Sequence, residues 1–104
     1  MPTVSTIYAT MRRSLVERSL SDVHGRLRKA RDELAVLDEQ LLVMNDIADD
    51  LRLRSLVSET PLAAQEHGEA QRHVDAAQRA RAALVETIAE LERKQDELLE
   101  RLTF

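Results

Sequence analysis

Four titratable side chains lie close together in the second half of the sequence: Glu66, His67, Glu69 and His73. On a helix, Glu66, Glu69 and His73 share one face, because residues three, four and seven apart line up. Carboxylate-bridged di-metal bundles use a Glu and a His three residues apart, both pointing inward, on each of two helices. Here Glu69 and His73 are four apart, and the inward position belongs to His67. We therefore expect His67 to pack between helices, His73 to face solvent, and the chain to bind no metal or cofactor.

A chain that doubles back on itself would set three further carboxylates, Asp46, Asp49 and Asp50, opposite this cluster. The chain has no cysteine, no Gly-rich phosphate loop, and no nucleophile with a recognisable base and orienting group. Two thin helices also cannot enclose a convergent pocket. We expect no enzymatic activity, and a protein that works by presenting surface.

The composition favours long helices. Of 104 residues only 2% are aromatic, with two glycines and two prolines, and the rest is rich in the strong helix formers Ala, Leu, Glu, Arg and Gln. This excludes a β-sandwich and a disulfide scaffold. No continuous apolar stretch resembles a secretory signal or a membrane span, so we expect a cytoplasmic protein that does not enter a membrane. The strong preference for Arg over Lys suggests a bacterial source.

An apolar residue recurs every 3.5 residues through the first half of the chain, which is the pattern of a coiled-coil seam. It predicts a first long helix over 14–57. The seam positions are Arg13, Val16, Leu20, Val23, Leu27, Ala30, Leu34, Leu37, Leu41, Met44, Ala48, Leu51 and Ser55.

The pattern breaks at residues 58–60, where we expect a turn. Thr60 is a good N-cap and Pro61 suits the first position of a helix, so a second long helix is predicted over 61–103. Its seam positions are Ala63, His67, Ala70, Val74, Ala77, Arg81, Leu84, Ile88, Leu91, Gln95, Leu98 and Leu102. The two series stay in register when the chain doubles back, which predicts an all-α antiparallel two-helix coiled-coil hairpin. Pro61 argues against one continuous helix in a parallel dimer.

The N-terminal arm, residues 1–13, has its own stripe of Val4, Tyr8 and Met11 on a different face from the seam. Pairs with capping-box spacing follow it, such as Ser14 with Glu17. We expect either a short helix with a kink between about Ser14 and Ser21, or an arm that orders only against a partner.

Further apolar residues lie off the seam, and a bare two-helix hairpin buries little surface. We expect self-association into a homodimer, a four-helix bundle, with docking of a different protein as the alternative. The candidate face for either contact contains Val36, Val43, Ile47, Leu53 and Leu56.

Charge is strongly polarised along the chain. Residues 1–31 carry +5, residues 32–70 carry −8 and residues 71–104 carry −1. The hairpin turn is therefore acidic, and the residues that could bind a partner there are Asp46, Asp49, Asp50 and Glu59. The simplest interpretation is a solvated surface that sets register and partner choice. The basic residues 26–31 could contact phosphates, but they lack interleaved aromatic residues and acids follow at once, so we expect no direct nucleic-acid contact.

Two resemblances bear on function. In architecture and charge, an acidic-tipped helical hairpin resembles the bacterial transcription factors that insert into the secondary channel of RNA polymerase, although those factors carry a second globular domain. The segment LRLRSLVSETPLA, residues 51–63, resembles the turn of small uncharacterised actinobacterial coiled-coil proteins, which implies no activity. We therefore expect a non-catalytic adaptor or scaffold, with an acidic-tipped regulator of a large nucleic-acid machine as the alternative.

Overall fold

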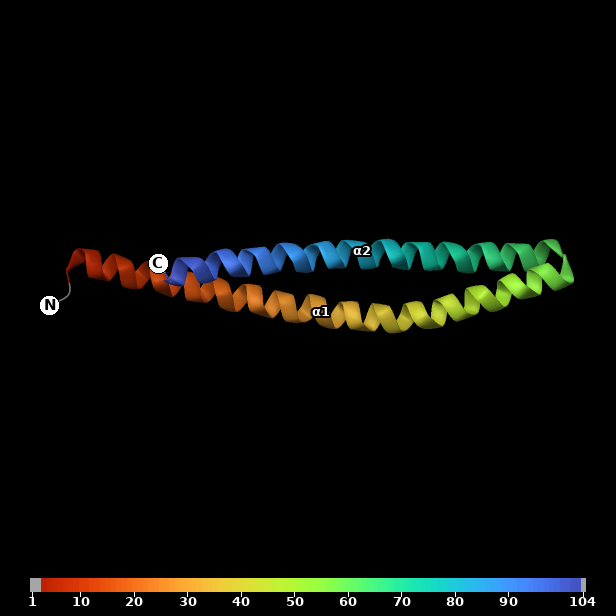
Figure 1. The fold of residues 1–104 in the computed structure, drawn as a ribbon, viewed down its shortest axis with the longest axis horizontal. Helices are drawn as coiled ribbons and strands as arrows, with labels where there is room; N and C mark the ends of the chain where they lie inside the picture. Colours follow the sequence, from red (N-terminus) through yellow and green to blue (C-terminus); the bar gives the residue numbers. More distant parts are fainter. Residues whose placement is uncertain (1–2, 104) are drawn as a thin grey trace. The chain divides into compact units, whose positions relative to one another are not determined.

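The computed structural model describes residues 3–103, and they form two helices. Helix α1 spans Val4–Ser58 and helix α2 spans Pro61–Thr103 (Figure 1). No strand occurs within the described residues. The prediction of an all-α helical hairpin is confirmed.

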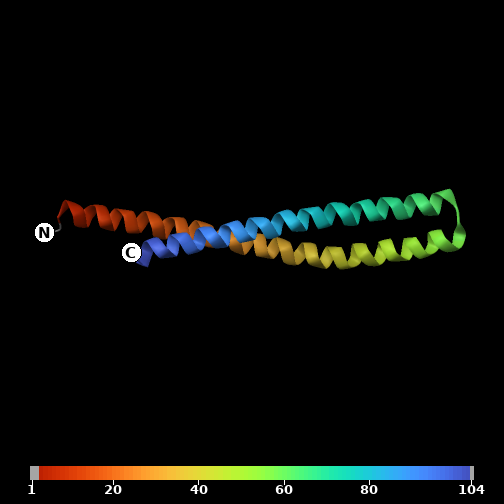
Figure 2. The same cartoon turned by 45° about the horizontal axis from the view of Figure 1, so that its top comes forward.

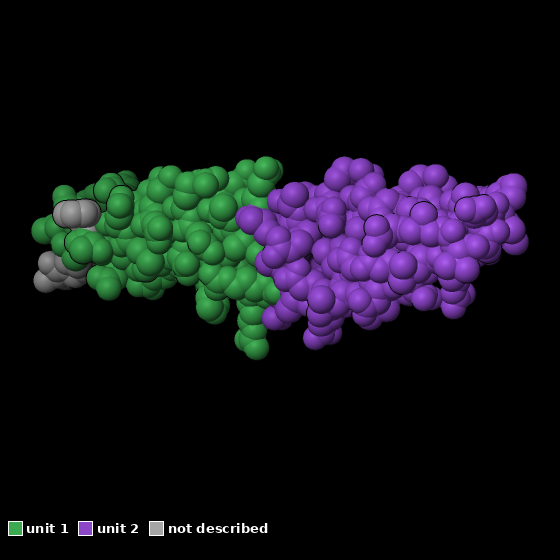
Figure 3. Space-filling view, turned by 45° about the vertical axis from the view of Figure 1, so that its right-hand side comes forward, with its two compact units in different colours: residues 1–31, 86–104 green, residues 32–85 purple. Residues whose placement is uncertain are grey.

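The hairpin divides into two compact units, and each contains one segment of α1 and one segment of α2 (Figure 3). Unit 1 combines Met1–Arg31 with Glu86–Phe104, and unit 2 is Asp32–Val85. Within unit 2 the chain turns between the helices, so the segments run antiparallel (Figure 2). Within unit 1 the pairing is also antiparallel, because the C-terminal part of α2 returns along the N-terminal part of α1.

The cores of both units are formed by the predicted seam. In unit 1, Val23 and Leu27 of α1 pack with Leu91 and Leu98 of α2. The buried residues of unit 2 are Leu41, Ala48, Val74 and Ala77. Among the described residues no polar or charged side chain is buried. Every buried hydrophobic residue therefore occupies a seam position, as the 3.5-residue repeat predicts.

The start of α1 differs from the expected kinked arm. Thr3 caps the helix, since its Oγ1 accepts a hydrogen bond from the amide of Thr6 at 3.2 Å. The helix then continues without interruption through residues 14–21, because no glycine or proline occurs there to break the backbone ladder. The serines with capping-box spacing cap nothing at these positions, and residues 1 and 2 of the expected arm lie outside the described part.

The turn consists of Glu59 and Thr60, one residue shorter than expected because Ser58 is still helical. Glu59 has a φ of 52°, and its amide donates to the carbonyl of Ser55 at 3.1 Å, which forms a left-handed C-terminal cap. Thr60 then caps α2, because its Oγ1 accepts from the amide of Ala63 at 3.2 Å. Pro61 stands at the first helical position. The predicted N-cap is confirmed.

One seam position of unit 2 departs from the pattern. Arg81 is exposed and turns to α1, where its Nε donates to Oδ1 of Asp38 at 2.6 Å. This hydrogen bond and the charge of Asp38 raise the pKa of Arg81 above its ordinary value. In unit 1, Arg31 and Glu92 form a second pair between the helices at 3.3 Å. Both pairs link the two helices and so favour the antiparallel register. Because both pairs are exposed to solvent, they add little stability.

The left-handed cap generates a testable prediction. Glu59→Gly is expected to raise the free energy of unfolding by about 0.5–1 kcal/mol, because glycine adopts positive φ without the steric cost that a Cβ imposes. The measurement is urea denaturation followed by circular dichroism. Glu59→Ala is the control, since it removes the same carboxylate and keeps the Cβ; equal stability of the two variants would contradict the backbone explanation.

Candidate functional site

The titratable cluster on α2 does not converge. His67 is half-buried on the seam, whereas His73, Glu66 and Glu69 are exposed. Glu69 accepts a hydrogen bond from Nε2 of Gln65 at 3.3 Å, along its own helix. Among residues 3–103, no group of three or more His, Asp or Glu side chains is arranged to hold a metal ion. The cluster therefore has the geometry of separate surface and seam residues.

The four acidic residues proposed for the tip are all exposed and belong to unit 2. Asp50 forms an ion pair with Arg54, one turn along α1, at 3.2 Å. Glu59 stands in the turn itself, while Asp46 and Asp49 lie further back along α1. The acidic residues are thus spread over several turns and do not form one compact cluster.

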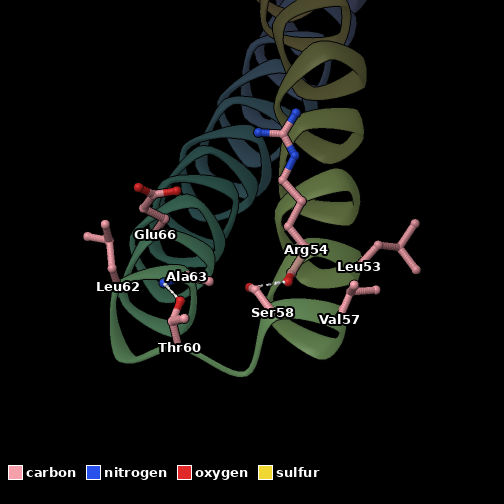
Figure 4. A pocket seen from close by; sticks show the side chains of 8 residues that line it. All are labelled: Leu53, Arg54, Val57, Ser58, Thr60, Leu62, Ala63 and Glu66. Atoms are coloured by element: carbon pink, nitrogen blue, oxygen red, sulfur yellow. Dashed lines mark hydrogen bonds between the residues drawn. The ribbon is translucent and has the colours of Figure 1, made fainter.

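Next to the turn is a shallow hollow of about 470 Å³. Figure 4 shows Leu53 and Val57 projecting from α1, and Leu62 and Glu66 projecting from α2. The three apolar side chains are 58%, 86% and 64% exposed, in chain order. The sequence marks all three as apolar residues off the seam, but it does not predict the hollow, which exists only where the two helix ends meet. The tip therefore combines exposed aliphatic side chains with the carboxylate of Glu66, which lines the hollow, and that of Glu59 in the turn.

The candidate docking face separates into two stripes on α1. Val36, Val43 and Ile47 are seven and four residues apart, so they follow one stripe. Leu53 and Leu56 follow another, which they share with Leu42. On that second stripe Asp46 and Asp49 stand between the leucines, so its apolar residues are interrupted by charge. All of these hydrophobic side chains are more than half exposed.

The first stripe has a counterpart on α2. Gln40 and Ile47 each precede a buried seam residue of α1, and His73 and Ala80 each precede a seam residue of α2. In an antiparallel pair, positions that precede the seam residues flank the same side of the seam. In unit 2 the two helices pair antiparallel, with Arg81 of α2 in contact with Asp38 of α1, and this pairing therefore brings the two stripes together on one side of unit 2.

We call this side of unit 2 the charge-free face. Its apolar members are Val36, Val43 and Ile47 on α1 and Ala76, Ala80 and Ala83 on α2. On α1 the stripe carries no charged residue between Glu33 and Asp50, and on α2 it carries no Asp, Glu, Lys or Arg between Glu69 and Glu90. In a chain with 33% charged residues, an exposed face without any charged residue is unusual.

Unit 1 carries a second hollow, between the N-terminal part of α1 and the end of α2. Leu98 and Leu102 of α2 line it together with Leu15 and Val16 of α1. Arg12, Arg13 and Arg101 also border the hollow. Sequence reasoning missed this site, because it joins residues more than 80 positions apart along the chain.

No family model, curated protein or solved structure matches the chain. The resemblance of residues 51–63 to actinobacterial coiled-coil proteins therefore stays a prediction. Within residues 3–103, neither helix contains a stretch with the length and apolar character needed to cross a membrane. Function must be argued from the exposed surfaces themselves.

The tip and the seam should respond differently to substitution. Val57→Ser is expected to change the free energy of unfolding by no more than about 0.5 kcal/mol, because Val57 is 86% exposed. Leu27→Ala is expected to cost about 2–5 kcal/mol, because Leu27 is 1% exposed and its loss leaves a cavity. Chemical denaturation of both variants is the measurement, and a large loss in Val57→Ser would show that the tip is covered.

Proposed function

We propose that the chain is a non-catalytic protein-interaction module, an adaptor or scaffold that self-associates as a homodimer and binds through helical surfaces in the cytoplasm. The charge-free face carries this proposal. It offers Val36, Val43 and Ile47 to solvent at 54%, 60% and 51% exposure. An isolated hairpin gains nothing from keeping such side chains together in water, since solvated helix faces are normally polar.

The balance between buried and exposed apolar residues supports the same proposal. Nine hydrophobic residues are buried in the described part of the chain, and three of these nine are alanines. The larger hydrophobic side chains that stay exposed outnumber them. A chain of this size gains further stability when a second layer of helices covers the exposed side chains.

Self-association is tested by mass in solution. Light scattering is expected to give about twice 11.8 kDa for the natural chain. Val43→Asp or Ile47→Asp is expected to halve that mass, because each places a charge in the apolar contact. Leu42→Asp is the matched control, since Leu42 is 69% exposed on the other stripe, and it should leave the mass unchanged. A natural chain that is monomeric would refute the homodimer.

A second candidate function is favoured by the tip hollow. In this second function the chain would be an acidic-tipped coiled-coil regulator that inserts into a large nucleic-acid machine such as bacterial RNA polymerase. The observation behind it is the exposed aliphatic group of Leu53, Val57 and Leu62 among the carboxylates of unit 2. Aliphatic contacts would supply binding energy, and the negative charge would steer the tip into a basic channel.

The tip hypothesis predicts a specific loss of binding. Asp49→Lys combined with Asp50→Lys is expected to weaken capture of purified bacterial RNA polymerase at least tenfold, because the steering charge is reversed, with helicity and oligomer mass unchanged. Asp96→Lys combined with Glu97→Lys is the control, since it reverses two exposed carboxylates on unit 1. Equal binding by both double variants, or none by the natural chain, would exclude the acidic tip as the determinant.

A further inference from the structure

The start of α1 carries large apolar side chains along one side of the helix, at intervals of three and four residues. We call them the arm stripe, and they are Val4, Ile7, Tyr8, Met11 and Leu15. All five lie within about 100° of the helix circumference. Their exposed fractions range from 48% to 67%. Thr6, Thr10 and Arg13 stand on other sides of the same turns. The start of α1 is therefore amphipathic.

Helix α2 does not cover the arm stripe. The beginning of α1 extends beyond the end of α2 in both views (Figures 1 and 2). Leu98 belongs to the cluster against which Val16 and Leu20 pack, so the end of α2 at Thr103 is level with about residue 13 of α1. Val16 and Leu20 also lie about 120° and 160° around the helix from Val4. Seen from the arm stripe, α2 therefore lies behind α1.

Positive charge follows the arm stripe along α1. Four exposed basic residues lie on the same line of the helix or border it: Arg12, Arg18, Arg26 and Lys29. Asp22 is the one carboxylate on this line in the part of unit 1 that the structure describes. Arg101 of α2 adds a further positive charge, since it borders the same hollow as Arg12. One side of α1 is therefore apolar at its start and basic over the next four turns.

The carboxylates at this end of α2 do not cancel that charge. They are Asp96, Glu97 and Glu100. All three belong to the helix that lies behind α1, away from a surface that touches the arm stripe. The arm stripe and the basic residues thus form one face of unit 1 that is complementary to a negatively charged apolar surface.

We infer that this face of unit 1 binds the surface of a bilayer that contains anionic phospholipids. Helix α1 lies in the plane of the interface, with the arm stripe at the boundary of the acyl chains and the basic residues on the lipid phosphates. Such binding needs no membrane-spanning stretch, and neither helix contains one within residues 3–103. The inference goes beyond the proposed adaptor function, whose contact surface lies in unit 2.

The size of the arm stripe favours a bilayer over a second copy of the chain. The arm stripe is about 16 Å long and about 10 Å wide, so two copies in contact through it bury only about 350 Å² in total. Stable protein interfaces need about 1,200 Å². A bilayer sets no such lower limit, because insertion of a few apolar side chains and attraction of several basic ones add together.

The apolar residues also favour lipid over nucleic acid. Phosphates of a nucleic acid would need only the basic side chains, and the arm stripe would stay exposed to water. An anionic bilayer accounts for both parts of the face, because it presents phosphates and acyl chains within one thin layer.

Vesicle binding by the purified full-length chain tests the inference. Vesicles of equal parts phosphatidylcholine and phosphatidylglycerol are expected to bind the chain at least tenfold more tightly than vesicles of phosphatidylcholine alone, and added salt should weaken the binding. Tyr8 is the only tyrosine, and the chain has no tryptophan. Its fluorescence should therefore become protected from acrylamide when the anionic vesicles are added.

Substitution in the arm stripe separates insertion from simple attraction. Met11→Asp is expected to weaken binding to the anionic vesicles at least tenfold, because it places a carboxylate at the acyl-chain boundary. Thr10→Asp is the matched control, since it adds the same charge on another side of the same turn, and it should bind within about threefold of the natural chain. Circular dichroism establishes that both variants keep their helicity.

A second pair of variants tests the basic part of the face. Arg12→Glu combined with Arg18→Glu is expected to weaken binding at least tenfold. Arg28→Glu combined with Arg93→Glu is the control, because it changes the net charge equally at exposed positions off this face. It should keep most of the binding.

Other results would overturn the inference. Failure of the natural chain to bind the anionic vesicles would remove it. Equal binding by Met11→Asp and Thr10→Asp, or Tyr8 left open to acrylamide, would show that the arm stripe does not insert. Binding of duplex DNA in place of vesicles, lost in the Arg12 and Arg18 double variant, would assign the basic residues to a nucleic acid. The proposed homodimer is tested separately by mass in solution, so it stands or falls independently of these results.

Discussion

The structure depends on one constraint, the repeat of an apolar residue every 3.5 positions along both helices. A seam of this kind occupies two of every seven positions, so burial is confined to a narrow stripe. The core of unit 1 is small and needs no aromatic residue. Its buried residues are Val23, Leu27, Leu91 and Leu98. Since the remaining positions lie outside the core, the surface dominates the chemistry of the chain, and the hollows in the described part are shallow and open to solvent.

The same constraint makes the turn important. Two helices can share a seam only if the chain reverses in the correct register, and here it does so with only Glu59 and Thr60. Thr60 and Pro61 start α2 with a side-chain cap and a residue that needs no amide partner. Glu59 ends α1 at a positive φ, where glycine would be less strained. The Cβ of Glu59 therefore costs some stability in the turn, and the use of glutamate there instead of glycine is consistent with a role for its side chain outside the fold.

Much of this fold could be predicted from periodicity alone, because seam burial is a local property of spacing. The series from Val16 to Leu51 and the cap at Thr60 required no tertiary information. Arg81 could not be placed in this way, since its side chain leaves the seam for Asp38, a residue 43 positions away. The N-terminal arm was also misjudged, because capping-box spacing marks a helix start only where the helix has not already begun at Val4.

The candidate surfaces were harder to predict for a related reason. Val36, Val43, Ile47, Leu53 and Leu56 were grouped because all are apolar and off the seam, and their exposure agrees with this. Their spacing along α1 separates the first three from the last two, and the pairing with α2 decides which of the two stripes has a neighbour on the other helix. Only the first three meet a stripe of α2 that also lacks charge, and the leucines alternate with Asp46 and Asp49. An apolar residue off a coiled-coil seam is therefore informative only together with its neighbours across both helices. A leucine among aspartates is compatible with a solvated surface, whereas a face without charge on two adjacent helices is the better candidate for a contact surface.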